Sequence, residues 1–382
     1  MTDSTWLVPL SDIAVDEELL TAGREAIASG WWSMGPRVAE LEASFADLTG
    51  SEHALAVANG TAALHLALLA LECGPGDEVV LPSLNFVAAA NVVTRVGATP
   101  VFCDIVGSAD LNLDPADLEA ALGPRTKAII VLHYAGYACD LDAILAIADR
   151  HGVAVIEDAA HAPGARLGSR ALGTFGAVGC FSFFSNKNVP VGEGGMIVTS
   201  NDELATRIRS LRSHGMTTLT WQRHKGHASS YDVVEAGLNY RLDELRAALA
   251  LVQLSRLADA NDARRRHVER YRACLEGVSG LELAFAAGDQ AASAHHLAVA
   301  VLSPYVSRDG VRDRLHGKRI QTSVHYPPIH GFTAYADAAR RRPLPVTDDV
   351  AARLITLPLY PHMRDDQVEL VADELMRAVT AG

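Results

Sequence analysis

The sequence lacks paired cysteines and long apolar runs, and each absence excludes a class of protein. The cysteines are scattered, odd in number and never at CxxC spacing, which argues against a disulfide framework and a zinc site; they are Cys73, Cys103, Cys139, Cys180 and Cys274. No apolar run approaches the length of a membrane span, and the first residues lack a basic region followed by an apolar one. We therefore expect a soluble cytoplasmic protein with reduced thiols, no bound metal and no membrane contact.

The chain also lacks an excess of basic residues and any repeat or low-complexity tract. Its 33 Lys+Arg against 46 Asp+Glu give a net charge of −13, the wrong sign for sequence-independent binding to nucleic acid. Any anionic ligand must therefore be held by local donors. With 382 residues, 49% hydrophobic and 21% charged, the chain has a globular composition and enough length for two domains and a large core.

The first 240 residues contain an alternation of strand-like apolar runs and helix-like segments. Strands are predicted at 54–57, 78–81, 99–102, 127–132, 153–156, 179–184 and 196–199, and helices at 16–29, 37–50, 61–73, 88–96 and 141–151. Strands that are apolar almost throughout are buried on both faces. The pattern therefore predicts an α/β fold with a mostly parallel sheet covered by helices on both sides.

The character of the chain changes after Tyr240. A long helix is predicted over 241–277, strands near 297–302 and 322–326, and a last helix over 365–381. We place a domain boundary within the long helix. Residues 1–250 then form an N-terminal arm and a large domain, and residues 251–382 form a smaller α+β domain.

One candidate for chemistry is a lysine displayed between two strands. Residues 176–195, Gly-Ala-Val-Gly-Cys-Phe-Ser-Phe-Phe-Ser-Asn-Lys-Asn-Val-Pro-Val-Gly-Glu-Gly-Gly, place Lys187 in a polar turn between two apolar runs. Its amine could stay in water as an ordinary surface charge, or be enclosed, lose its proton and form an imine with a carbonyl cofactor. Taken alone, the stretch favours the surface charge.

Other strand ends carry candidate binding residues, and ligands of such sheets bind outside the carboxyl ends of the strands. The stretch 59–63, Asn-Gly-Thr-Ala-Ala, opens a helix whose free N–H groups favour a phosphate, although a plain Asn-Gly turn with a Thr cap explains it too. Asp158 could pair with a pyridinium nitrogen or could only cap a helix, and His161 could steady its carboxylate or stack nearby. Phe86 could lie on a flat heteroaromatic ring or belong to the core.

A fourth stretch, 237–244, Gly-Leu-Asn-Tyr-Arg-Leu-Asp-Glu, precedes the long helix. Asn239 and Arg241 could reach an anion there, although a charged, capped helix start explains them nearly as well. The chain thus contains, in this order, a helix start that can bind a phosphate, an aromatic residue that can stack on a ring, an acid at a strand end and a lysine that can form an imine. Together they are the groups that pyridoxal 5'-phosphate (PLP) requires.

Six short motifs give the sequence a family resemblance. They are Ala-Asn-Gly-Thr-Ala-Ala-Leu-His-Leu-Ala-Leu, Gly-Pro-Gly-Asp-Glu-Val-Val-Leu-Pro-Ser, Glu-Asp-Ala-Ala-His-Ala-Pro-Gly, Phe-Ser-Phe-Phe-Ser-Asn-Lys-Asn, Gly-Glu-Gly-Gly and Gly-Leu-Asn-Tyr-Arg-Leu-Asp-Glu. In this order they resemble the DegT/StrS-type sugar aminotransferases, PLP enzymes of fold type I. The resemblance runs from about Gly30 to the C-terminus and implies a large domain with a mostly parallel seven-stranded sheet.

The resemblance also implies roles where positions match. Lys187 matches the Schiff-base lysine, Asp158 the pyridinium partner and Phe86 the ring-stacking position. Asn239 matches a residue that reaches the phosphate from the neighbouring subunit, which implies a homodimer with two composite sites. The other implied positions are the phosphate contacts Gly60, Thr61 and Ser182 with Ala62 beside them, His161 next to the cofactor, and the turn Glu193, Gly194 and Gly195.

The implied reaction is transamination. An amino donor, glutamate or glutamine, would give its amino group to a keto-sugar, usually one linked to a nucleoside diphosphate, in amino-sugar or secondary-metabolite biosynthesis. The dehydratase branch of the family is disfavoured because position 187 is lysine and not histidine. The alternatives are amination of a keto-cyclitol, elimination or replacement chemistry on an amino acid, and a non-catalytic regulator that merely inherits the fold.

Substrate contacts are predicted in three segments. The segment 214–235 is long and basic for a loop and could contact an anionic substrate, in this or the partner's site, or be a solvated surface loop. Two other segments could line the pocket, with core packing as the alternative for their aromatic residues. The candidates are Trp32, Ser33, Met34, Arg223, His224, Lys225, His227, His325 and Tyr326.

Overall fold

The computed structural model describes residues 6–217, 231–339 and 342–380. Its main feature is a seven-stranded sheet with the order β1-β9-β8-β5-β4-β2-β3. The strands are β1 His53–Val57, β2 Glu78–Pro82, β3 Thr99–Cys103, β4 Thr126–Leu132, β5 Ala154–Asp158, β8 Val178–Ser182 and β9 Gly195–Thr199. Neighbouring strands are parallel except at β9, which is antiparallel to β1 and β8. The mostly parallel sheet and all seven of its strands are confirmed.

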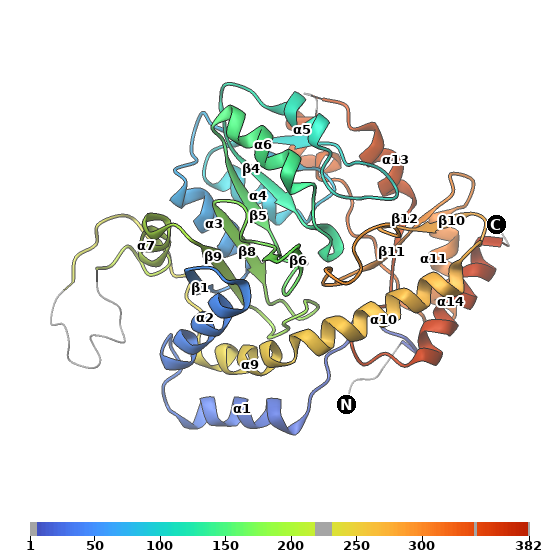
Figure 1. The fold of residues 1–382 in the computed structure, drawn as a ribbon, viewed down its shortest axis with the longest axis horizontal. Helices are drawn as coiled ribbons and strands as arrows, with labels where there is room; N and C mark the ends of the chain where they lie inside the picture. Colours follow the sequence, from blue (N-terminus) through green and yellow to red (C-terminus); the bar gives the residue numbers. More distant parts are fainter. Residues whose placement is uncertain (1–5, 218–230, 340–341, 381–382) are drawn as a thin grey trace.

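Helices cover both faces of this sheet (Figure 1). One face packs against α3 Gly60–Ala70, α4 Ala88–Arg95 and α7 Asp202–Leu211, and the other against α2 Pro36–Thr49, α5 Pro115–Ala121, α6 Leu141–His151 and α9 Glu244–Ser255. In β1, Leu55 and Val57 join the first core and Ala54 and Ala56 the second, because successive side chains of a strand point to opposite faces. Burial on both sides explains why the strands are mostly apolar.

A second, smaller sheet follows in the chain. It consists of the antiparallel strands β10 Leu281–Leu283, β11 Ala298–Leu302 and β12 Leu354–Leu357, and its core includes residues of α10 Leu257–Leu275, α11 Arg308–Gly317 and α14 Asp365–Thr380. The N-terminal arm reaches this region, where Val8 pairs with Ile320. The domain boundary near residue 250 stays a prediction. The remaining elements are α1 Glu17–Ala28, β6 Arg166–Leu167, β7 Arg170–Ala171, α12 Ala336–Ala339, α13 Pro345–Arg353 and the 3-10 helices Tyr134–Gly136, Ile329–Gly331 and Thr333–Tyr335.

Two predictions about the second half of the chain are wrong. The helix expected over 241–277 is two helices, α9 and α10, which meet at Arg256. The break lies where the packing partners change, because α9 packs on α1 and α2 whereas α10 packs on α14. The strand expected near 322–326 is a loop in which only Ser323 makes an isolated bridge, to Thr356 in β12. Pro327 and Pro328 follow at once, and proline cannot donate to a strand ladder.

Two further observations bear on the class of protein. Within the described ranges, we find no helix that combines the length and the apolar character needed to cross a bilayer. The five cysteines are free thiols, as predicted, and all but Cys274 are buried.

The end of β5 is fixed by a buried carboxylate, Glu157. Its oxygens accept hydrogen bonds from the N–H groups of Gly173, Phe175 and Gly176 at 2.6–2.7 Å and from the His133 ring at 2.8 Å. Burial by itself opposes the charge, but these donors, His133 first, hold the pKa of Glu157 below its usual value. Glu157 thus ties the loop before β8 to the strand that carries Asp158.

We expect the substitution Glu157→Gln to lower the free energy of unfolding by about 3 kcal/mol or more, because each carboxylate oxygen faces two donors and the new amide NH2 would oppose them. Urea unfolding followed by circular dichroism measures this loss. The control is Glu119→Gln, since Glu119 is half exposed and paired with Arg150 on the surface, where the change should stay below about 1 kcal/mol. Equal stability of the two variants would contradict the anchoring role.

Candidate active site

A cavity of about 420 Å³ lies at the carboxyl ends of β5 and β8 and at the start of α3. It is lined by residues from segments that are far apart in the sequence. Most of the residues predicted from strand ends and motifs meet here: Gly60, Thr61, Phe86, Asp158, His161, Ser182, Lys187, Glu193, His325 and Tyr326. Parallel strands bring their carboxyl ends to one edge, which is why these distant positions converge.

The start of α3 has the geometry of an anion site. Asn59 caps the helix by accepting a hydrogen bond from the Ala62 N–H at 2.8 Å, so the cap is Asn59 and not Thr61. As the first residues of a helix, Gly60 and Thr61 have N–H groups without an intrahelical acceptor. A Cβ atom at Gly60 would lie 2.9 Å from the Ser182 Cβ atom. Glycine therefore lets the end of β8 approach the helix, and both meet at one point of the cavity.

Ala62 itself is buried and its N–H is occupied by the cap. It does not line the cavity. A similar close approach occurs at Gly195, where a Cβ atom would lie 2.8 Å from the Asn59 carbonyl oxygen. The glycine cluster after Lys187 thus lets β9 pass beside the start of α3.

Lys187 lies in the turn between β8 and β9, as predicted. Its backbone N–H donates to the Phe184 carbonyl at 2.8 Å, and its side-chain amine lies 3.4 Å from Nε2 of His296. Enclosure by protein lowers the pKa of the amine to about 8, although nearby Asp158 acts in the opposite direction. Lys187 is half-buried and lines the cavity, so its amine is not an ordinary surface charge.

Asp158 is the last residue of β5 and is only 6% exposed. One carboxylate oxygen accepts a hydrogen bond from the Ala160 N–H at 3.1 Å, a short local cap. Burial raises the pKa of Asp158, against the opposing effects of this bond and of Lys187. No ion pair joins it to a lysine or arginine in the described part of the chain. Such a carboxylate is suited to a cationic partner supplied by a ligand.

Of the two roles predicted for His161, the structure contradicts a hydrogen bond to Asp158. Its Nδ1 accepts a bond from the Ala135 N–H at 3.3 Å, so its Nε2–H donates to the Tyr326 hydroxyl at 2.8 Å. Burial holds the pKa of His161 well below its usual value, so the ring is neutral. The ring instead positions Tyr326 on one wall of the cavity.

Phe86 also lines the cavity and is 55% exposed, which excludes the core role. Its ring centroid lies 5.8 Å from that of Tyr326. His325 also lines the cavity, with its Nδ1 atom 3.0 Å from the Thr356 hydroxyl oxygen. The loop that was predicted as a strand thus delivers two side chains to the cavity.

Other predicted residues do not line this cavity. Trp32 is 64% exposed and donates to the Ile27 carbonyl, Ser33 is exposed, and Met34 packs against the core. Asn239 is exposed and its backbone pairs with Ser213. Arg223, His224, Lys225 and His227 lie outside the described residues.

Sequence reasoning missed three side chains. Asn85 lines the cavity, and its buried Nδ2 group has no hydrogen-bond partner among the residues that the structure describes. His296 contacts the Lys187 amine, and Asn188 contacts His296. His296 precedes β11, so a search of residues that follow strands could not find it.

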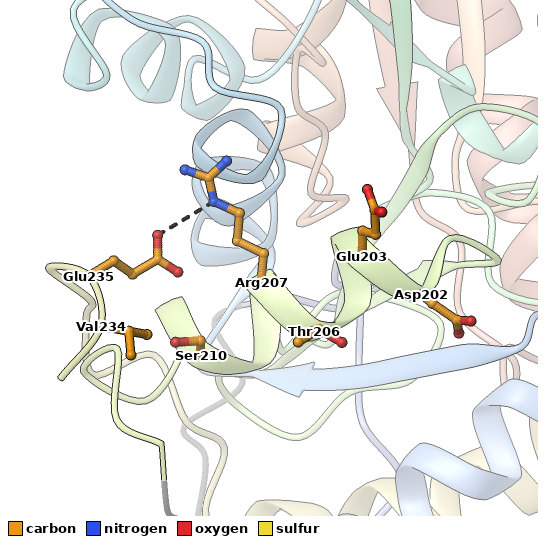
Figure 2. A pocket seen from close by; sticks show the side chains of 7 residues that line it. All are labelled: Asp202, Glu203, Thr206, Arg207, Ser210, Val234 and Glu235. Carbon is orange, nitrogen blue, oxygen red and sulfur yellow. Dashed lines mark hydrogen bonds and ion pairs between the residues drawn. The ribbon is translucent and has the colours of Figure 1, made fainter. Parts of the chain in front are cut away.

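A second depression lies along α7 and is lined by Asp202, Glu203, Thr206, Arg207, Ser210, Val234 and Glu235 (Figure 2). Arg207 reaches Glu235 at 3.4 Å and Glu72 at 2.7 Å. Because its guanidinium is already paired with carboxylates, the described residues of this depression offer no free cation to an anionic ligand. The cavity beside Lys187 is the better candidate for chemistry.

The family model described as the DegT/DnrJ/EryC1/StrS aminotransferase family matches residues 14–376. The chain is 40% identical to the spore coat polysaccharide biosynthesis protein SpsC of Bacillus subtilis (strain 168), over 98% of this chain and 97% of SpsC. It is 36% identical to the solved aminotransferase TlmJ from Streptoalloteichus hindustanus, with a TM-score of 0.90 over 98% of this chain and 99% of TlmJ. DesI, solved in the presence of its TDP-sugar product, is 32% identical, with a TM-score of 0.86 over 99% of this chain and 94% of DesI.

These matches span nearly the whole chain, and the predicted fold type I architecture is confirmed by the solved aminotransferases. The predicted enzyme class is confirmed as well, and the non-catalytic alternative falls. The chain belongs to the DegT/DnrJ/EryC1/StrS aminotransferase family.

Proposed function

We propose that this protein is a PLP-dependent aminotransferase that moves an amino group from glutamate or glutamine to a keto-sugar carried on a nucleoside diphosphate. The observation that carries the proposal is that one cavity holds a lysine amine with a lowered pKa and a buried carboxylate that forms no ion pair within the described part of the chain. The names of SpsC and DesI, which concern a polysaccharide and a TDP-sugar, favour a sugar over a cyclitol or an amino acid.

The residues of the cavity fit PLP. The start of α3, together with Ser182, suits the phosphate, because the first N–H groups of the helix are free to bind an anion. Glycine is needed at position 60, since any side chain there would occupy the space beside Ser182. Lys187 suits the aldehyde and Asp158 the pyridine nitrogen. Phe86 offers a flat, exposed face to the ring. The unpartnered Nδ2 group of Asn85 is a further donor for a bound oxygen.

When bound, PLP supplies an electron sink for the electron pair released as a Cα–H bond breaks. Lys187 would take the proton at Nζ and return it, since a pKa of about 8 lets the amine hold or release a proton near neutral pH. Asp158 would hold a proton on the ring nitrogen as its counter-charge. Tyr326 and His161, both neutral, would exclude water and shape the wall without competing for that proton.

We also keep the homodimer as part of this proposal. Asn239 is exposed and absent from its own chain's cavity, as a residue that serves a neighbour would be. The segment around Arg223 stays a candidate for substrate contact, and the cytoplasmic location stays a prediction.

A two-stage assay tests the function. Protein loaded with PLP is given glutamate or glutamine, the keto acid is measured, and the washed protein is then offered ketones. We expect an aminated product, identified by mass spectrometry, from a nucleoside diphosphate keto-sugar. Amination of only non-phosphorylated keto-sugars or keto-cyclitols would overturn the nucleotide-linked substrate. Failure of every amino donor to yield a keto acid would count against transfer itself.

A further inference from the structure

A chain of hydrogen bonds runs from two backbone carbonyls to the Lys187 amine. Asn261 donates from Nδ2 to the Pro163 carbonyl at 2.9 Å, which leaves its Oδ1 as an acceptor. Asn188 donates from Nδ2 to that Oδ1 at 2.8 Å and to the Ala294 carbonyl at 2.8 Å. A backbone carbonyl can only accept, so both amide orientations are determined.

This direction fixes the tautomer of His296. The Oδ1 atom of Asn188 lies 3.0 Å from the His296 Nδ1 atom and can only accept, so Nδ1 carries the proton. The other ring nitrogen, Nε2, then presents its lone pair to the Lys187 amine, 3.4 Å away. Asn188 follows Lys187 directly in the sequence, so the lysine turn also holds the ring that its own amine contacts.

The surroundings of His296 keep its ring neutral. The residue is 3% exposed, and its ring centroid lies 4.4 Å from that of His161. Burial, and then the nearby charged or titratable groups of Lys187, His161, Arg264 and His325, hold the pKa of His296 well below its usual value. A neutral imidazole in one tautomer is a fixed acceptor.

We propose that His296 is a positioning residue for Lys187: it accepts one N–H of the amine and turns the nitrogen lone pair toward the cavity. This inference rests on the proposed function, in which that lone pair attacks a carbonyl carbon and takes up a proton. His296 also favours the ammonium form, because an acceptor binds a cationic donor more strongly than a neutral one. Removal of His296 should therefore make the Lys187 amine easier to deprotonate. It should also leave the nitrogen lone pair less well oriented toward the cavity.

Two measurements on the full-length chain, freed of cofactor, test this without any substrate. Acetic anhydride labelling across pH, with mass spectrometry of the Lys187 peptide, gives the midpoint at which the amine becomes reactive, expected near 8 in the unaltered chain. In His296→Leu we expect the midpoint at lower pH. At pH 10, where the amine is neutral in both proteins, we expect PLP capture to be slower by about fivefold or more.

Two variants separate positioning from packing. His296→Gln can place its Oε1 near the lost Nε2 atom, so both the midpoint and the capture rate should return toward those of the unaltered chain. His295→Leu removes the neighbouring buried ring, which bonds to Gln290 and Tyr137 and not to Lys187, and should change neither quantity.

Packing alone predicts the opposite shift, because water entering the space left by His296 would return the amine toward its ordinary pKa of 10.5. A higher midpoint in His296→Leu, an unchanged one, or no recovery in His296→Gln would each overturn the inference. Transamination could still stand in any of these cases, since its assay measures keto acid and product. Conversely, a lowered midpoint with Gln rescue would support positioning even if the substrate proved different.

Discussion

Replacing Lys187 with alanine is expected to lower turnover by about 10⁴-fold or more and to abolish the absorbance of lysine-bound PLP. The reason is that one amine both binds the cofactor carbon and carries the proton. Stability should not fall, because burial opposes the charge of this amine and its loss removes that penalty. Turnover, the cofactor spectrum and urea unfolding of the same preparation measure the three quantities.

The control for this variant is Lys127→Ala. Lys127 lies exposed in β4, so its removal should leave turnover and spectrum unchanged. Activity within about tenfold of the unaltered enzyme in Lys187→Ala would exclude the proposed role, whatever happens to the spectrum.

The second large effect is expected at Asp158. The substitution Asp158→Asn keeps the size of the side chain and an oxygen for the Ala160 N–H, but removes the negative charge that would pair with the ring nitrogen. We expect turnover to fall by about 10³-fold and PLP to dissociate more readily, with little change in stability. Single-turnover kinetics and a PLP titration measure these effects.

The neighbouring acid provides the contrast. Glu157 has four donors on its carboxylate and lies at the end of the same strand, so Glu157→Gln should lose stability first, whereas Asp158→Asn should lose activity first. If Asp158→Asn unfolds as readily as Glu157→Gln, or retains full turnover, the assignment of the two acids is wrong.

Much of the large domain could be predicted because its strands are buried on both faces. This burial makes β1, β2 and β4 continuous apolar runs that stand out from the polar segments around them. The positions of Gly60, Phe86, Asp158 and Lys187 at or after strand ends also predicted that their side of the sheet forms one site, since parallel strands end at one edge. All four line the cavity.

The second half resisted prediction for a different reason. The strand β12 is only four residues long and follows α13 without a break, so no turn signal separates it from the helix. The loop 322–326 has an apolar, strand-like beginning, but the prolines after it and the packing of its neighbours decide its course. The partner of His161 was missed likewise, because Tyr326 lies 165 positions away.

The sequence by itself determined the sheet, the cofactor-type residues at its edge and the family, because each depends on local pattern and on chain order. Three features followed from tertiary packing alone: Lys187 is half-buried in the cavity wall, His161 bonds to Tyr326 and not to Asp158, and His296 directs the Nε2 lone pair toward the amine. The tautomer of His296, for example, depends on atoms contributed by distant segments, here Pro163, Asn261 and Ala294. No local pattern records which of these atoms will be neighbours.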